Sequence, residues 1–136
     1  MINSYTNTTL AVLTNGTLNF NNDSVKTGCT VTHSPGSTTF SLNKPGFYFV
    51  TFNGVGAATD ATVGNIVVQL QRNGVNIPGA LTSAASTTAQ TDVESLSFST
   101  IVQVKPSCCA VDNNVNLTFV NTGIPTTFSN INVVIT

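Results

Sequence analysis

The stretch SLNKPGFYFVTFNGV, residues 41–55, places apolar side chains on both faces of a predicted β-strand. Successive side chains of a strand point to opposite faces of the sheet, so Tyr48 and Phe52 point one way while Phe47 and Phe49 point the other. Leaving two phenylalanines in water would forgo roughly 3–5 kcal/mol of burial free energy. A single two-sheet domain has one interior, so we expect a loop or a neighbouring subunit to cover the second face.

Short alternating segments separated by turn residues fill the rest of the chain, which predicts an all-β fold of two packed antiparallel sheets. Asn43-Lys44-Pro45-Gly46 predicts a tight turn, and Asn73-Gly74 predicts a two-residue hairpin, because both of its residues tolerate positive φ. The predicted strands are residues 10–13, 17–20, 28–32, 38–42, 46–55, 65–72, 93–104, 114–121 and 128–135.

Two segments lack this alternation and are predicted to be exposed loops. Residues 54–64 and 80–91 are rich in glycine, alanine and hydroxyl side chains. Because binding residues are frequent on loops, we regard Asp60, Thr87 and Thr88 as candidate surface-binding residues.

Composition excludes several classes of partner. The 136 residues fit one domain, and the net charge of −1 leaves no basic face for nucleic acid. The 23 threonines and 17 asparagines supply polarity in place of charge. Residues 1–16 resemble neither a secretory signal nor a membrane span, so we expect synthesis in a cytoplasm, without membrane contact.

The three cysteines and the single histidine leave several interpretations open. Cys29, His33, Cys108 and Cys109 would supply a zinc site only if two distant turns met, and adjacent cysteines rarely bind one ion. Cys29 could also pair with Cys108 or Cys109 in a disulfide. We favour small buried thiols, and expect no metal and no cofactor.

Catalysis has little support in the sequence. No carboxylate lies close to His33 along the chain, so a Ser–His–Asp set could be assembled only from distant segments. Asp92 and Glu94 lie on one face of a strand and could offer two oxygens to calcium, but a solvated pair is the simpler interpretation. We expect a protein that is not an enzyme.

One family resemblance stands out at this point. Phe40, Gly46, Tyr48 and Phe52 follow the spacing F-x5-G-x-Y-x-F-x-[FY] of complement globular heads and tumour-necrosis-factor-like (TNF-like) domains, with Val50 where the pattern prefers phenylalanine. The succession FSLNKPGFYFVTFN, VQLQRNGVNIPGA, SFSTIVQVKPSCCAVDNNVNLTFVNTG and SNINVVIT resembles small bacterial and prophage members, including phage virion proteins and exosporium-type surface domains. The resemblance implies a TNF-like jelly roll that assembles as a homotrimer.

On this basis we expect a jelly roll in residues 28–136 and a separate N-terminal anchoring segment in residues 1–27. Phe47, Tyr48, Phe49 and Phe52 are the candidate core and trimer-interface residues. Leu10, Val12 and Leu13 are the candidate anchoring residues, which would pair with a capsid or other virion protein. The expected function is structural, as a head-decoration or short head-fibre protein in the virion of a bacteriophage. The alternative is a spore- or cell-surface module that recognises a glycan or a receptor.

Overall fold

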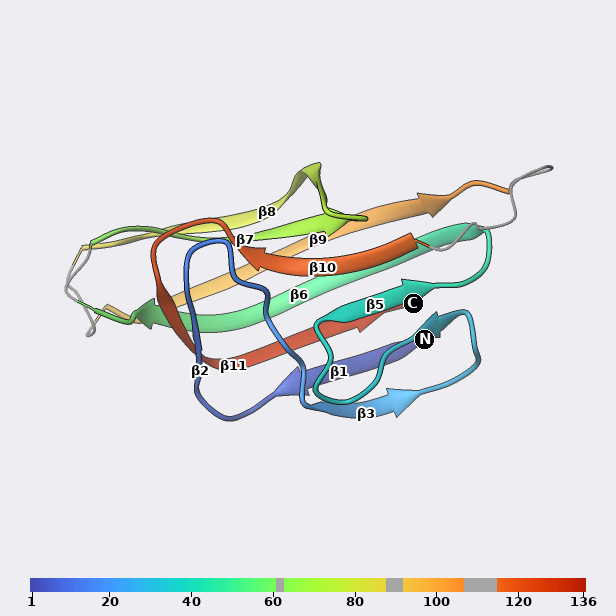
Figure 1. Ribbon diagram of the computed structural model, residues 1–136, viewed down its shortest axis with the longest axis horizontal. Helices are drawn as coiled ribbons and strands as arrows, with labels where there is room; N and C mark the ends of the chain where they lie inside the picture. Colours follow the sequence, from blue (N-terminus) through green and yellow to red (C-terminus); the bar gives the residue numbers. More distant parts are fainter. Residues whose placement is uncertain (61–62, 88–91, 107–114) are drawn as a thin grey trace.

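The computed structural model describes residues 1–60, 63–87, 92–106 and 115–136. These residues form an all-β sandwich of two antiparallel sheets (Figure 1), which confirms the predicted fold class. The strands are β1 Ile2–Thr6, β2 Leu10–Val12, β3 Asn22–Lys26, β4 Val31–Thr32, β5 Thr39–Leu42, β6 Gly46–Ala58, β7 Gly64–Arg72, β8 Val75–Ser86, β9 Glu94–Val104, β10 Val115–Asn121 and β11 Thr126–Ile135. No helix that could span a membrane occurs in this part of the chain.

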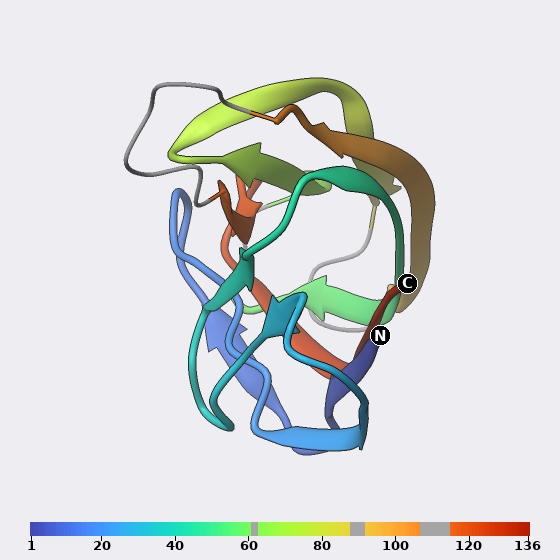
Figure 2. The same cartoon turned by 90° about the vertical axis from the view of Figure 1, so that its right-hand side faces the viewer.

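Sheet A has the strand order β3-β1-β11-β6-β9, with β2 paired to the beginning of β11. Sheet B has the order β4-β5-β10-β7-β8. The two termini lie side by side because Ile2 pairs with Ile135, as both views show (Figures 1 and 2). The predicted hairpin is confirmed: Asn73 and Gly74 have φ values of 50° and 83° and join β7 to β8.

The core lies between the sheets and is centred on phenylalanines from both. Phe20, Phe40 and Phe119 meet edge to face, with ring centroids 5.3–6.1 Å apart, and Phe52 stacks on Phe119 at 5.4 Å. Fully buried side chains from both sheets, and Leu18 from the segment before β3, surround them: Ile2, Leu18, Leu42, Ile66, Leu70, Leu96 and Leu117. Hydrophobic packing between the sheets therefore holds the fold.

Several predicted boundaries were wrong. β6 continues to Ala58 and β8 continues to Ser86, into the segments predicted as loops. Strands β1, β3 and β8 were not predicted. Residues 17–20 make only an isolated bridge, between Thr17 and Val120, although Leu18 and Phe20 are buried in the core. The misses share a cause: the inward positions of β1 and β8 carry small or hydroxyl side chains, which give no apolar alternation.

The N-terminal segment belongs to the sandwich and is not separate from it. β1 is hydrogen-bonded on one side to β11 and on the other to β3, so both of its edges are occupied. Leu10–Val12 already pairs with Thr126–Phe128. Within the described part of the chain, β1 therefore offers no free edge, whereas Leu10–Val12 is paired along one edge. Anchoring through this segment stays a prediction.

Candidate functional site

Strand β6 presents two apolar side chains to solvent, as the alternation predicted. Tyr48 and Phe52 are buried in the core, whereas Phe47 is 73% exposed and Phe49 46% exposed. Of the four interface or core candidates, two therefore lie in the core and two on the outward face of sheet A. No part of the described chain covers Phe47 and Phe49, so a loop of the described residues is not the second cover.

A third apolar side chain joins them from the neighbouring strand. Ile101 of β9 pairs directly with Phe49 and is 65% exposed. We call Phe47, Phe49 and Ile101 the apolar patch. Cross-strand neighbours on one face lie about 5 Å apart, so the three form one continuous surface.

The patch borders a groove between the edge strands of the two sheets. The groove has a volume of about 690 Å³ and is lined by residues of β8 and β9, among them Val75, Ile77, Ile101 and Val104. Val75 is 70% exposed. Ile101 belongs to both features, so the exposed apolar surface continues from the face of sheet A around the edge of β9.

The three candidate anchoring residues have different environments. Val12 is buried and Leu10 is half-buried against the core, because β2 packs on β11. Leu13 alone is exposed, at 73%. Their anchoring role stays a prediction, and Leu13 is the one side chain of the three that is available to a partner.

The candidate loop residues lie where β6 and β8 end. Asp60 and Thr87 are exposed, and Thr88 lies outside the described residues. The backbone N–H and the hydroxyl of Thr87 both donate to Asp92 Oδ2, at 2.8 and 3.1 Å. This contact fixes the end of β8 against the beginning of β9, and binding by these residues stays a prediction.

Asp92 also acts on the carboxyl of Glu94. A hydrogen bond that the protonated Glu94 carboxyl donates to Asp92, the negative charge of Asp92 and slight desolvation together raise the pKa of Glu94 above its ordinary value. Within the described residues no group of three or more histidine, cysteine or acidic side chains could hold a metal ion. Whether Asp92 and Glu94 bind calcium stays open.

Replacing Asp92 should return the pKa of Glu94 toward its ordinary value. Asp92→Asn removes the neighbouring negative charge, so ionisation of Glu94 becomes easier and its titration midpoint moves to lower pH. The ¹³C shift of the Glu94 carboxyl, followed by NMR from pH 2 to pH 7, measures this. A midpoint that does not move would show that Asp92 does not perturb Glu94.

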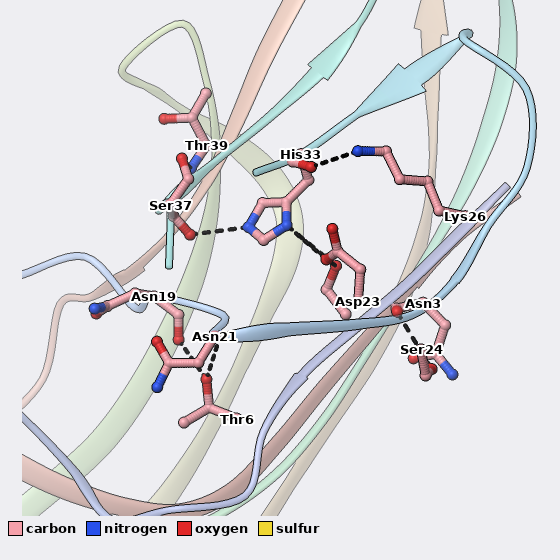
Figure 3. A network of polar contacts seen from close by, with 11 residues as sticks. Asn3, Thr6, Asn19, Asn21, Asp23, Ser24, Lys26, His33, Ser37 and Thr39 are labelled. Atoms are coloured by element: carbon pink, nitrogen blue, oxygen red, sulfur yellow. Dashed lines mark hydrogen bonds and ion pairs between the residues drawn. The ribbon is translucent and has the colours of Figure 1, made fainter. Parts of the chain in front are cut away.

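The structure brings together a polar cluster that the sequence did not reveal (Figure 3). His33 Nδ1 lies 2.7 Å from Asp23 Oδ1, and His33 Nε2 lies 2.9 Å from the carbonyl oxygen of Ser37. The Ser4 hydroxyl donates to the same Asp23 oxygen, and Lys26 Nζ donates to the carbonyl oxygen of His33 at 2.9 Å. The His33 ring also stacks on Phe40, with centroids 4.4 Å apart.

This cluster joins β1, β3 and the segment from His33 to Ser37. Both ring nitrogens of His33 have oxygen neighbours within hydrogen-bond distance, Asp23 Oδ1 at Nδ1 and the Ser37 carbonyl oxygen at Nε2. The Ser4 hydroxyl also lies 3.4 Å from Nδ1. β3 brings Asp23 to His33 from ten residues earlier in the sequence, a carboxylate partner that the sequence pattern did not identify.

The cysteine interpretation needs one correction. Cys29 is exposed and not buried, because it lies in the turn before β4, where its carbonyl oxygen accepts a bond from Asn43 Nδ2 at 3.0 Å. Cys108 and Cys109 lie outside the described residues. Pairing between them and Cys29 therefore stays open.

Comparison with known proteins supports the fold and no narrower assignment. No family model and no curated protein matches the sequence. The structure is similar to the globular domain of a zebrafish complement 1qA protein, with a TM-score of 0.65 and 10% identity over 98% of this chain and 94% of that one. A family 35 carbohydrate-binding module from Cellvibrio japonicus gives a TM-score of 0.43 and 16% identity over 98% and 96% of the two chains. The chain thus has the two-sheet, TNF-like jelly-roll fold of a complement globular domain.

Proposed function

We propose that this chain is a non-enzymatic binding and structural module that assembles through its apolar patch into a homotrimer. The observation that carries the proposal is the exposure of Phe47, Phe49 and Ile101 as neighbours on the outward face of sheet A. Contiguous apolar surface of this kind marks interaction sites on soluble proteins. The resemblance to complement and TNF-like domains implies an assembly of three copies with closed cyclic symmetry.

The groove between β8 and β9 offers a surface on which the apolar patch of a neighbouring copy can pack. In a cyclic trimer every interface joins two different surfaces, one from each of two neighbouring copies. The face of sheet A offers the apolar patch, and the edge between β8 and β9 offers a groove with Val75 and Ile77 on its walls. Packing one against the other would remove both surfaces from water.

The absence of enzymatic activity is part of the proposal. His33 is the one histidine of the chain, and both of its ring nitrogens are engaged.

Of the two roles expected from the sequence, we favour the surface-binding module over virion decoration. The decoration role relied on residues 1–20 to add a strand to a capsid protein, and β1 and β2 are already paired within sheet A. A decoration protein would have to attach through another surface. Copurification with phage particles, together with loss of that copurification in a Leu13→Asp variant, would restore the decoration role.

The assembly makes a direct prediction. Sedimentation equilibrium should give about three times the 14.1 kDa chain mass at micromolar concentration. Phe47→Asp and Phe49→Asp should each yield unassembled chains, because an unpaired carboxylate would be buried at the interface.

Val25→Asp is the matched control, since Val25 is 40% exposed on the edge strand β3 of the same sheet. That variant should still assemble. A wild-type protein that sediments as a monomer would overturn the proposed assembly, whatever the behaviour of the variants.

A further inference from the structure

The outward face of sheet A changes character along its strands. Beyond the apolar patch, the strand register aligns Tyr5 with Asn132, Asn132 with Asn53, and Asn53 with Ser97, in one row across β1, β11, β6 and β9. We call these four residues the amide row. It lies four residues beyond Phe49 along β6, or about 13 Å at the rise of a strand.

The amide row lies in a shallow hollow. The hollow has a volume of about 560 Å³, and its polar lining includes Tyr5, Asn53, Ser95, Ser97, Asn130 and Asn132. The register of β11 against β6 shifts between Phe128 and Asn130, which marks a bulge at this point. Bulges bend a strand and increase its twist, which accounts for a concave surface on an otherwise regular sheet.

The lining carries no charged side chain. A site built for a phosphate, a carboxylate or a metal ion would need opposite charges or several converging carboxylates. Each asparagine offers two N–H donors and one carbonyl acceptor, and each serine offers a hydroxyl that both donates and accepts. This inventory matches a neutral ligand whose own groups both donate and accept hydrogen bonds.

Much of this hydrogen-bonding capacity is available. Asn132 Nδ2 donates to Asn3 Oδ1 at 2.7 Å, which orients the Asn132 amide and leaves its carbonyl oxygen for a ligand. Asn53 and Asn130 are exposed, and within the described part of the chain their side chains make no hydrogen bond to protein. Tyr5 is half-buried beside them and adds an aromatic ring.

We propose that this hollow, which we call the amide trough, binds a neutral carbohydrate. The hydroxyls of a sugar both donate and accept, as the trough requires, and the apolar C–H face of a sugar ring suits the ring of Tyr5. The volume lies within the range of ligand sites in proteins. The proposal goes beyond assembly, and it requires that the trough stay open in the assembled protein.

The test is an NMR titration of the ¹⁵N-labelled full chain in its native assembly. The probes are four neutral hexasaccharides, of glucose, xylose, mannose and N-acetylglucosamine, each added to about 10 mM so that millimolar Kd values are detected. We expect at least one of them to shift the side-chain amide signals of Asn53 and Asn132. A hexamer of galacturonic acid is the charged control and should leave these signals unmoved.

Matched variants locate the site. Asn53→Ala combined with Asn132→Ala should weaken binding of the active hexasaccharide by about 20-fold, because each lost hydrogen bond is worth about fivefold. Asn65→Ala, an exposed asparagine on β7 of sheet B, should bind as the wild type does. Analytical ultracentrifugation of each variant shows whether assembly is intact, which separates a binding defect from a failure of the proposed trimer.

Three results would overturn the proposal. The first is that none of the four hexasaccharides shifts the trough signals of the wild type. The second is that the shifts fall on the loops around Asp60 and Thr87 and spare the trough, which would place the sugar elsewhere. The third is that the double variant, with its assembly intact, binds as tightly as the wild type.

Discussion

Removal of residues 1–20 is expected to leave no folded domain. The deletion takes out β1, which is hydrogen-bonded to both β11 and β3, and it exposes the whole of β3. It also removes Ile2, Leu18 and Phe20, which are each 0% exposed in the core. Loss of a buried phenylalanine alone costs about 3–5 kcal/mol, a large part of the total stability of a small domain.

Circular dichroism and thermal melting measure this effect. The truncated chain should show no cooperative transition, whereas Leu13→Asp should melt close to the wild type because Leu13 is 73% exposed. The Leu13 variant is therefore the control for a change within the same segment. A truncated chain with a cooperative transition would instead support a separate anchoring segment in residues 1–27.

Local pattern was enough to predict the centre of the fold. The alternation in residues 46–55 predicted two opposed apolar faces, and Tyr48 and Phe52 are indeed buried on the side opposite Phe47 and Phe49. The cover expected over the second face is not supplied by the described part of the chain. Asn73-Gly74 predicted a hairpin because a two-residue turn needs positive φ at both positions, which asparagine and glycine tolerate. Both residues do have positive φ in the structure. Information of this kind is contained in a few neighbouring residues.

Strands with polar inward positions could not be predicted in this way. Ser4 and Thr6 of β1 are buried because partners distant in sequence satisfy their hydroxyls, as when Thr6 Oγ1 donates to the carbonyl oxygen of Asn19 at 2.8 Å. Gln69 is buried in a similar way: its Nε2 lies 2.9 Å from the carbonyl oxygen of Ile77 and 3.1 Å from that of Ala80. These contacts support the irregular register between β7 and β8. Burial of these polar side chains depends on hydrogen bonds that form only in the folded sandwich, so it leaves no alternating apolar pattern in the sequence.

The Asp23–His33 pair was missed for the same reason, although one signal was available. Asp23 precedes the single histidine by ten residues, with a glycine between them that permits the chain to return. A histidine on a predicted strand needs a polar partner if it is buried. Without the topology, however, nothing in the sequence favoured Asp23 over the other four acidic residues.

Asp23→Ala should be among the most destabilising single substitutions in the chain. His33 has a fully buried side chain, and Asp23 is exposed by only 7% of its side-chain surface. Removal of one partner of a buried pair leaves the other uncompensated, at a cost of about 3–5 kcal/mol. The carboxylate is also the acceptor for Ser4, so the contact between β1 and β3 loses a second bond.

Urea denaturation measures the loss of unfolding free energy, and Ser24→Ala is the control. Ser24 is the next residue of β3, is exposed, and makes a long 3.4 Å contact, so its substitution should cost less than about 0.5 kcal/mol.

Asp23→Ala combined with His33→Phe should recover part of the loss, because the apolar ring can keep the stack on Phe40 and needs no acceptor. Hydrogen exchange adds a local readout: in Asp23→Ala the amides of β3 should lose protection before those of β6, because β3 is an edge strand bonded to β1 alone. An Asp23→Ala variant as stable as Ser24→Ala would contradict this prediction. It would show that the Asp23–His33 pair stabilises neither β3 nor the turn before β5, and that backbone pairing alone stabilises the edge of sheet A.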